Sequence, residues 1–558
     1  MSSFAAPRAL ADRVGARLEE LDRSRFVPRL WEKDPSLWKE DGAHRKVIGN
    51  RLGWLSSVRS MEPELEGVRA FAEEARADFR RALLLGMGGS SLCPEVLAKT
   101  FGAAEGALDL RILDSTDPAA VSEAAAWAEE EKTLFIVASK SGGTAEVDAF
   151  RRFFTERVKD PARFIAITDP GSPLEALATG EGYRRVFLNP PDIGGRFSAL
   201  SFFGLVPAAL LGLDPGRLLD RAAAMTESCG PDRAPAMNPG VHLGVFLAEA
   251  ALMGRDKMTL LFSDRLAPLG TWVEQLVAES TGKEGKGIVP VDLEPAGEAE
   301  EYGSDRLFVC VRIEGEPGRE GEARRFEGAG HPVARIELAD EYGLGAEFFR
   351  WEVATAAACA VLGVNAFDEP NVKESKEETN RLLAAFAERG ALGEGTPAAE
   401  DGGMALYTDG ASDGPAGDVD FLVRTHLARA GEGDYLAFLA YAHGTDEIAA
   451  LLGGLRAGAR KKTGLATSGG FGPRFLHSTG QLFKGGPNGA VVFQITCDDG
   501  SDLPIPGLPH TFGVLKNAQA LGDLAALRAH GRRALRCHVR GDVAAGLRRL
   551  TRVVGAGM

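Results

Sequence analysis

Short apolar runs, each followed by a polar turn and then a helical stretch, recur along most of the 558-residue chain. Such alternation is typical of β-α-β units, in which helices cover both faces of a parallel sheet. The first series predicts five strands, at Ala82–Leu85, Leu108–Leu113, Thr133–Ala138, Phe164–Ile167 and Arg185–Leu188. The pattern therefore restricts this part of the chain to an α/β fold built on a doubly wound parallel sheet.

A second series begins near Lys257 and is followed by a predicted long helix over about Gly345–Val361. Its strands are predicted at Met258–Phe262, Ile288–Val291, Leu307–Arg312 and Val333–Leu338. A third series follows residue 418, with strands predicted at Tyr435–Ala442, Leu465–Ser468, Val491–Thr496 and Arg536–Val539. Each run is short and bounded by turn-forming residues, as buried strands are.

These patterns divide the chain into five parts. Residues 1–80 are charged and helical in pattern, and residues 390–418 are rich in Gly, Ala and Asp, which predicts a linker or long loop. We expect a first α/β domain over residues 81–240 and a second over residues 241–389. A third α/β segment is expected over residues 419–558.

Two Gly-rich turns lead from a predicted strand into a helix, GMGGSSL at Gly86–Leu92 and SKSGGTAE at Ser139–Glu146. Glycine lets the backbone approach a ligand, and the free N–H groups of a helix N-terminus attract an anion. The first turn alone is a weak signal, since a tight turn needs the same residues. The second adds three hydroxyls and one cation, a set that suits a phosphate dianion; they belong to Ser139, Lys140, Ser141 and Thr144.

Four further stretches carry side chains suited to acid–base chemistry or to charge stabilisation. Arg196 follows two glycines, and Gln275 and Glu279 lie one turn apart near the end of a predicted helix. Lys376 lies two turns into another helix, and His477 lies in a glycine-flanked loop. Taken singly, an arginine, glutamate or lysine of this kind is more often solvated, and a lone histidine is more often structural.

Taken together, these stretches resemble the phosphoglucose isomerase family, which is built on paired sugar-isomerase (SIS) domains. Six motifs carry the resemblance: GMGGSSL, SKSGGTAE, GGRFS, ESTGK, LGVNAFDEPNVKESK and LHSTGQ. It covers roughly residues 45–380 in order and parts of residues 435–540. The resemblance implies two doubly wound, parallel-sheet SIS domains. A helical N-terminal segment would precede them, and a relocated C-terminal α/β segment would follow.

The resemblance also implies an activity and a role for each residue. A phosphorylated hexose would be isomerised between glucose 6-phosphate and fructose 6-phosphate through ring opening and an enediolate, a step of glycolysis and gluconeogenesis. Glu279 would move the proton between C2 and C1, Arg196 would stabilise the enediolate, and His477 and Lys376 would assist ring opening. The other residues would bind substrate, with Ser139, Lys140, Ser141 and Thr144 at the phosphate and Gly89, Ser90 and Gln275 at the sugar. Neither a metal nor a cofactor is expected.

Two features depart from the family pattern. The histidine segment of typical members lies between the glutamate and the lysine, whereas His477 here follows both Glu279 and Lys376. This order resembles the isomerase half of fused transaldolase–glucose-6-phosphate isomerases. Glu369 stands where the family commonly has Gln.

The histidine of typical members comes from a neighbouring subunit. Relocation of its segment would allow the same chain to supply it, so either a homodimer or a monomer is expected. Two alternatives to the main reading stay open. One is a related isomerase that accepts mannose 6-phosphate. The other is a non-catalytic phosphosugar-binding SIS protein, which would need the phosphate loop but not a proton shuttle.

Bulk composition limits partners and location. The net charge of −15 argues against a general nucleic-acid binder, which needs a basic face. The six cysteines are scattered with no C-x-x-C pair, so a reducing compartment is expected. The N-terminal stretch has no apolar signal core, and the longest apolar stretch is too short to span a bilayer. A cytoplasmic protein without a membrane partner is predicted.

Overall fold

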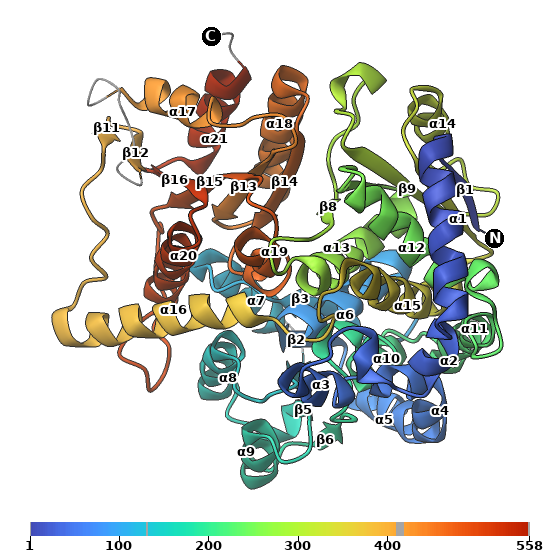
Figure 1. The fold of residues 1–558 in the computed structure, drawn as a ribbon. Coiled ribbons are helices and arrows are strands. Elements are labelled where there is room, and N and C mark those ends of the chain that lie inside the picture. Colours follow the sequence, from blue (N-terminus) through green and yellow to red (C-terminus); the bar gives the residue numbers. More distant parts are fainter. Residues whose placement is uncertain (1, 130–131, 409–417, 556–558) are drawn as a thin grey trace.

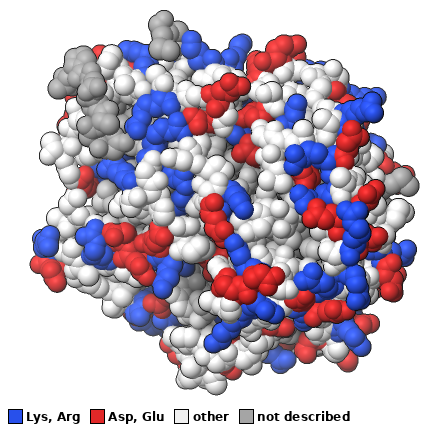
Figure 2. Space-filling view, in the orientation of Figure 1, with Lys and Arg blue, Asp and Glu red and all other residues white. Residues whose placement is uncertain are grey.

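The computed structural model describes residues 2–129, 132–408 and 418–555, and the described residues form three sheets with helices packed around them (Figure 1). Strands of each sheet are flanked by helices that follow them in the chain, so the predicted α/β class with doubly wound parallel sheets is confirmed. On the face drawn in Figure 2, basic and acidic side chains are interspersed.

The first sheet has the strand order β3-β2-β4-β5-β6, and all its neighbouring strands are parallel. Strand β2 pairs with both β3 and β4, so the chain reverses its direction across the sheet there. Ligands bind α/β sheets at such switch points, outside the carboxyl ends of the strands. The strands are β2 (Arg81–Gly86), β3 (Asp109–Leu113), β4 (Thr133–Ala138), β5 (Phe164–Thr168) and β6 (Arg185–Leu188), and the helices that follow them are α6 (Leu92–Phe101), α7 (Pro118–Glu129), α8 (Ala145–Val158) and α9 (Pro173–Glu181).

The second sheet has the order β1-β10-β9-β7-β8 and is parallel except for β1 at one edge. The predicted helical character of residues 1–80 is therefore wrong for Ser2–Ala5, which pairs antiparallel with β10. An edge strand needs only one partner, so four residues without a periodic pattern can form it. The other strands are β7 (Lys257–Phe262), β8 (Val289–Val291), β9 (Arg306–Ile313) and β10 (Val333–Leu338).

Helices fill the space around these two sheets. The long helices α13 (Ala267–Thr281) and α15 (Leu344–Leu362) pack against each other, and α16 (Pro370–Arg389) leads out toward the third sheet (Figure 1). The remaining helices of this part are α1 (Arg8–Arg23), α2 (Phe26–Trp31), α3 (Gly42–Gly49), α4 (Ser57–Met61), α5 (Leu65–Asp78), α10 (Phe202–Leu210), α11 (Pro215–Ser228), α12 (Pro239–Leu252) and α14 (Glu320–Gly328).

The third sheet has the order β11-β12-β16-β15-β13-β14. Its parallel part is β13 (Tyr435–Tyr441), β14 (Ala466–Phe471), β15 (Ala490–Cys497) and β16 (Arg533–Val539), with helices α17 (Val419–Leu427), α18 (Asp446–Thr463), α19 (Gly480–Gly485), α20 (Phe512–Ala529) and α21 (Val543–Gly555).

The predicted linker over residues 390–418 differs from the structure in its middle. Residues Ala399–Glu400 and Met404–Tyr407 form β11 and β12, and β12 joins β16 antiparallel. The stretch MALY is short but apolar, and Met404, Ala405 and Leu406 are buried by this pairing. Residues 409–417 of the predicted linker lie outside the described residues.

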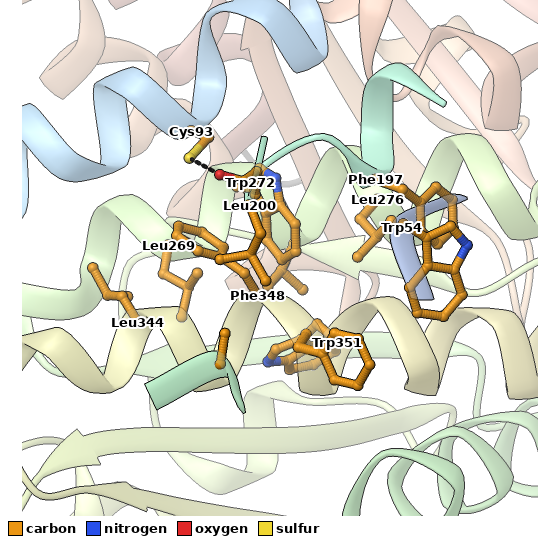
Figure 3. Close-up of a cluster of buried hydrophobic side chains, with 14 of the residues drawn as sticks. Trp54, Cys93, Phe197, Leu200, Leu269, Trp272, Leu276, Leu344, Phe348 and Trp351 are labelled. Atoms are coloured by element: carbon orange, nitrogen blue, oxygen red, sulfur yellow. Dashed lines mark hydrogen bonds between the residues drawn. The ribbon is translucent and has the colours of Figure 1, made fainter. Parts of the chain in front are cut away.

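One hydrophobic core joins the N-terminal helices to the first two sheets (Figure 3). Trp54 packs against Phe197 with ring centroids 5.3 Å apart, and Trp272 packs against Phe348 at 4.9 Å. Trp272 lies on α13, so the helix that carries Gln275 and Glu279 is fixed by this core. Such dense packing holds a side chain in place on a rigid element.

We call each sheet, together with the helices packed around it, a unit, and number the three units as the sheets are numbered. The third unit packs on both of the others. Leu476, Leu482 and Phe483 share a buried cluster with Ala278 of α13 and with β8, while Phe512 and Leu515 of α20 join a cluster of the first unit. Helix α20 also crosses α16 closely: a Cβ at Gly522 would lie 2.7 Å from Thr379 Oγ1. The third unit therefore contacts both the first and the second unit.

Candidate active site

A cavity of about 240 Å³ lies where the three units meet. Ten of the eleven predicted site residues line it, and they come from six separate segments of the chain: Gly89, Ser90, Lys140, Ser141, Thr144, Arg196, Gln275, Glu279, Lys376 and His477. Ser139 is the exception: it begins the loop between β4 and α8, and its Oγ contacts other residues of that loop. Arg51 and Phe367 also line the cavity, and the motifs predicted a role for neither of them.

The loop between β4 and α8 is organised by its own hydroxyls. Ser139 Oγ lies 3.0 Å from Thr144 Oγ1 and accepts from Gly142 N at 3.1 Å, and Ser141 Oγ accepts from Gly143 N at 3.3 Å. Gly142 has a φ of +67°, a conformation that favours glycine. The result is a preformed turn at the N-terminus of a 14-residue helix, a geometry that attracts anions.

Lys140 contributes charge to this loop while being held by protein groups. Its Nζ pairs with the Asp169 carboxylate and donates to the carbonyl of Pro191 at 3.1 Å. The ammonium is thereby fixed at the rim of the cavity that Ser141 and Thr144 line.

The turn after β2 packs tightly against the segment that carries Arg196. A Cβ at Gly89 would lie 2.1 Å from the carbonyl oxygen of Gly195, closer than any real contact. Gly88 has a φ of +55°, and a Cβ there would lie 2.8 Å from Gln275 Nε2. The glycines of GMGGSSL are therefore required by close approach of three segments at the floor of the cavity.

Glu279 and Arg196 form a buried ion pair in the cavity wall. Arg196 Nη1 lies 2.9 Å from Glu279 Oε1 and 3.1 Å from Glu369 Oε2, and its Nε donates to Ser280 Oγ at 3.2 Å. Burial raises the pKa of Glu279; Arg196 opposes the rise, and the charge of Glu369 adds to it. A carboxylate with a raised pKa beside a fixed cation can exchange a proton with a substrate carbon and stabilise the anion that forms.

Gln275 links the base to the histidine loop. Its Nε2 donates to Glu279 Oε2 at 3.2 Å and to the backbone carbonyl of His477 at 2.6 Å. Its Oε1 is buried without a hydrogen-bond partner among the described residues. Because buried polar atoms are normally paired, this oxygen is suited to accept from a ligand hydroxyl.

His477 lies in a short turn between β14 and α19 and is paired with a carboxylate of the first unit. Its Nε2 donates to Glu146 Oε1 at 2.9 Å, and Gln519 Nε2 donates to the same oxygen at 2.7 Å. Burial alone would raise the pKa of Glu146, but the charge and hydrogen bond of His477 lower it to about 2. Lys376, on the exposed side of α16, lines the same wall and adds positive charge toward Glu146.

Glu146 is a functional candidate that sequence reasoning missed. It belongs to the quoted stretch SKSGGTAE, as a carboxylate in the first turn of α8, but a helix N-terminus commonly carries one. Its partner His477 is 331 residues away in sequence, so no local signal reveals the pair.

This chain is similar in sequence to several known proteins. The model of the phosphoglucose isomerase family matches residues 57–292. The chain is 30% identical over 398 residues to a glucose-6-phosphate isomerase of Rubrobacter xylanophilus, covering 60% of this chain and 90% of that relative. It is 27% identical over 407 residues to one of Citrifermentans bemidjiense, covering 65% and 76%.

Two solved structures share the fold. A hypothetical protein from Thermus thermophilus is 27% identical with a TM-score of 0.58, and the match covers 69% of this chain and 100% of that one. A glucose-6-phosphate isomerase from Chlamydia trachomatis is 20% identical with a TM-score of 0.51, covering 65% and 78%. Among the described residues no helix is long and apolar enough to cross a membrane.

Proposed function

The chain belongs to the phosphoglucose isomerase family and is an aldose–ketose isomerase of phosphorylated sugars, and we propose that it interconverts glucose 6-phosphate and fructose 6-phosphate. The observation that carries the proposal is the buried pair of Glu279 and Arg196 in a cavity that His477 also lines. A protein that only binds a phosphosugar needs a phosphate loop, but it does not need a buried base paired with a cation and an acid–base histidine beside it.

The substrate phosphate is bound by the loop between β4 and α8. Ser141 and Thr144 line the cavity there, Ser139 braces the turn from behind, and Lys140 supplies charge. The free N–H groups at the start of α8 add donors and a positive dipole end. The sugar then extends past Gly89 and Ser90 toward Gln275.

Ring opening is assigned to His477. An imidazole can take a hydroxyl proton and return one to the ring oxygen near neutral pH. Glu146 holds the ring of His477 by accepting from Nε2, and Lys376 lines the cavity beside it.

Proton transfer is assigned to Glu279. In the open-chain aldose Glu279 takes the proton from C2, and the C1 carbonyl oxygen becomes the negative oxygen of an enediolate. The hydroxyl proton then moves from the C2 oxygen to the C1 oxygen, and the same carboxyl returns its proton to C1 as the C2–O bond becomes the ketose carbonyl. Arg196 stabilises the negative charge that develops on the enediolate oxygens. Its multiple bonds to Ser280, Ala366 and Asp368 hold the guanidinium in place before the substrate arrives.

The test is conversion of fructose 6-phosphate to glucose 6-phosphate, read with a coupled dehydrogenase. We expect turnover by the native enzyme and a loss of about 10³-fold or more in Glu279→Gln, with phosphosugar binding retained. Glu284→Gln is a matched control, since Glu284 lies on the same segment but forms a surface pair with Lys39.

Three outcomes would contradict parts of the proposal. Tight phosphosugar binding without turnover of any hexose phosphate would favour a non-catalytic role. Equal turnover of mannose 6-phosphate would broaden the substrate class. Full activity in Glu279→Gln would assign the proton transfer to another group.

We further propose that each chain forms a complete site, so that a monomer is active. His477 reaches Glu146 and the cavity within one chain. Mixing Glu279→Gln with His477→Asn tests this directly: no activity should return on mixing. Restored activity would mean that the histidine acts across a subunit interface.

The same proposal extends to cellular setting. The interconversion belongs to glycolysis and gluconeogenesis, and all six cysteines are free and buried, which suits a reducing compartment such as the cytoplasm. Fractionation of cells should recover the protein with soluble enzymes.

A further inference from the structure

Arg474 begins the short turn that ends at His477, and it reaches away from the third unit into the first. Its guanidinium forms two contacts with the Glu95 carboxylate, one of them 3.2 Å from Nη1 to Oε1. Nη1 also lies 3.4 Å from Asp114 Oδ2. These carboxylates belong to α6 and to the segment directly after β3.

The three side chains are largely shielded from solvent. Exposure of the side chain is 24% for Arg474, 13% for Glu95 and 11% for Asp114. Burial raises the pKa of Glu95 on its own, yet Arg474 lowers it to about 2. A two-point arginine–carboxylate contact of this kind fixes geometry as well as charge.

The contacts lead to the substrate side of the cavity. Ser91 Oγ donates to Asp114 Oδ2 at 3.4 Å, and Ser91 follows Ser90, which lines the sugar end of the site. Glu95 lies on α6, whose N-terminus follows the same glycine turn. Arg474 therefore ties the histidine turn to the part of the first unit that contacts the sugar.

Other charged groups near this pair do not replace the arginine. Lys99 Nζ lies 2.6 Å from Glu95 Oε1 but is 62% exposed, and it comes from the same helix as its partner. Glu274 of α13 also faces Arg474 electrostatically. Only Arg474, among these groups, belongs to the third unit.

We propose that Arg474 is the positioning residue that sets where His477 lies in the sugar site, an inference that rests on the proposed isomerase function. His477 is supplied by a separate unit, so its turn must be docked against the first unit with sub-ångström consistency. Misplacement of a catalytic group by about 1 Å costs up to about 10²-fold in rate. Arg474 touches no reacting atom and acts through the histidine.

The test is a double-mutant cycle on kcat with fructose 6-phosphate. Arg474→Gln should lower kcat by about 10- to 100-fold with little change in KM. In a His477→Asn background the same substitution should change kcat by less than about twofold, because its effect acts through a side chain already removed. Arg474→Lys, which keeps the charge and loses the two-point contact, should give an intermediate rate.

Arg549→Gln is the matched control. Arg549 also pairs with two carboxylates, Asp401 and Asp420 at 2.7 Å each, and is 25% exposed, but it lies at the far side of the third unit. The Arg549→Gln substitution should therefore leave kcat unchanged. Equal losses in both arginine variants, or an unaltered kcat in Arg474→Gln, would overturn the proposal, as would effects that multiply in the double variant.

A measurement that does not depend on turnover can test the positioning role of Arg474 separately from the proposed isomerase activity. The ring of His477 pairs with Glu146 and lines the cavity, so the NMR chemical shifts of its imidazole should change in Arg474→Gln and Arg474→Lys. If the native enzyme shows no isomerase activity, the proposed function fails and the shift alone still tests docking. Imidazole chemical shifts of His477 that match the native protein in folded Arg474→Lys would refute the positioning role.

Discussion

Glu369→Gln is the substitution whose effect on the site can be worked out most directly. Glu369 and Glu279 bind the same nitrogen, Arg196 Nη1. Two carboxylates on one cation repel each other, and the charge of Glu369 raises the pKa of Glu279. Glutamine keeps the shape and can still accept from Arg196, while it removes the charge.

The distances set the size of the effect. Because the two contacts with Nη1 measure 2.9 and 3.1 Å, the two carboxylate oxygens lie at most about 6 Å apart. At an effective dielectric constant of about 20 to 40, unit charges at that separation repel by about 1.4–2.8 kcal/mol, or about 1–2 pKa units. Since 51% of the Glu369 side chain is exposed, solvent screening reduces this. We expect the pKa of Glu279 to fall by about one unit in the variant.

The assay is the pH dependence of kcat/KM, whose acidic limb reports the base of the free enzyme. Glu279 must be ionised to act, so a lower pKa moves this limb to lower pH by about one unit. The second ionisation of the phosphate near pH 6 is common to both enzymes and cancels in the comparison.

Glu378→Gln serves as the control for this prediction, since it lies on the same helix and pairs with Arg381 at the surface. Its profile should match that of the native enzyme. An acidic limb that stays in place in Glu369→Gln, or moves to higher pH, would refute the idea that the two carboxylates share Arg196 in solution.

Three further predictions concern stability and support of the site. Glu352 is fully buried, neither of its carboxylate oxygens has a hydrogen-bond partner in the part of the chain that the structure describes, and burial raises its pKa. Its folded-state pKa lies above the unfolded value, so its contribution to stability is lost as pH rises through the folded pKa; Glu352→Gln should therefore become more stable relative to the native protein in urea melts between pH 6 and pH 9, and a constant difference would be the contrary result. Glu146→Gln should lower kcat by about tenfold with phosphosugar binding retained, because His477 loses its charged partner. Gly89→Ala should lower the free energy of unfolding by about 1–3 kcal/mol and remove most of the activity, because its Cβ would overlap the carbonyl of Gly195. An unfolding curve like that of the native protein would mean that the turn can relax.

The parallel strands could be predicted because their signal is local. Buried strands need apolar residues on both faces, so runs such as Thr133–Ala138 contain six buried residues between turn formers. The antiparallel edge strands had no such signal. Strand β1 has the sequence SSFA and β12 is four residues within a Gly- and Asp-rich stretch, and each exists because a neighbouring strand offers a free edge.

The motifs predicted most residues of the candidate site, but they predicted only in part where those residues lie and what they contact. The glycine turns and the Glu279 helix lie at strand ends or on a helix fixed by core packing, so their motifs indicate their place. Glu146 was not predictable, because its partner comes from another unit. Lys140 is the reverse case. Its motif predicted it as a site residue, but its ion pair with Asp169 could be identified only from the tertiary structure.

The resemblance predicts that the histidine segment has been relocated, and the structure shows that its place in the chain does not keep it from the site: His477 follows Lys376 in sequence yet lines the same cavity. A site of this kind depends on where loops lie at the carboxyl ends of strands, and not on the order in which the chain visits them. A chain in which the histidine segment comes last needs an interface that holds the third unit against the other two. Here that interface is charged and buried: Lys516 of α20 donates to Asp117 of the first unit at 2.9 Å, and Gln519 bonds to Glu146. Three of the four residues in these contacts, Lys516, Asp117 and Gln519, lie outside the six motifs, and only Glu146 belongs to one of them. The side chains that we propose do the chemistry can therefore be predicted from motifs, whereas most of those that bring the units together can be identified only in the structure.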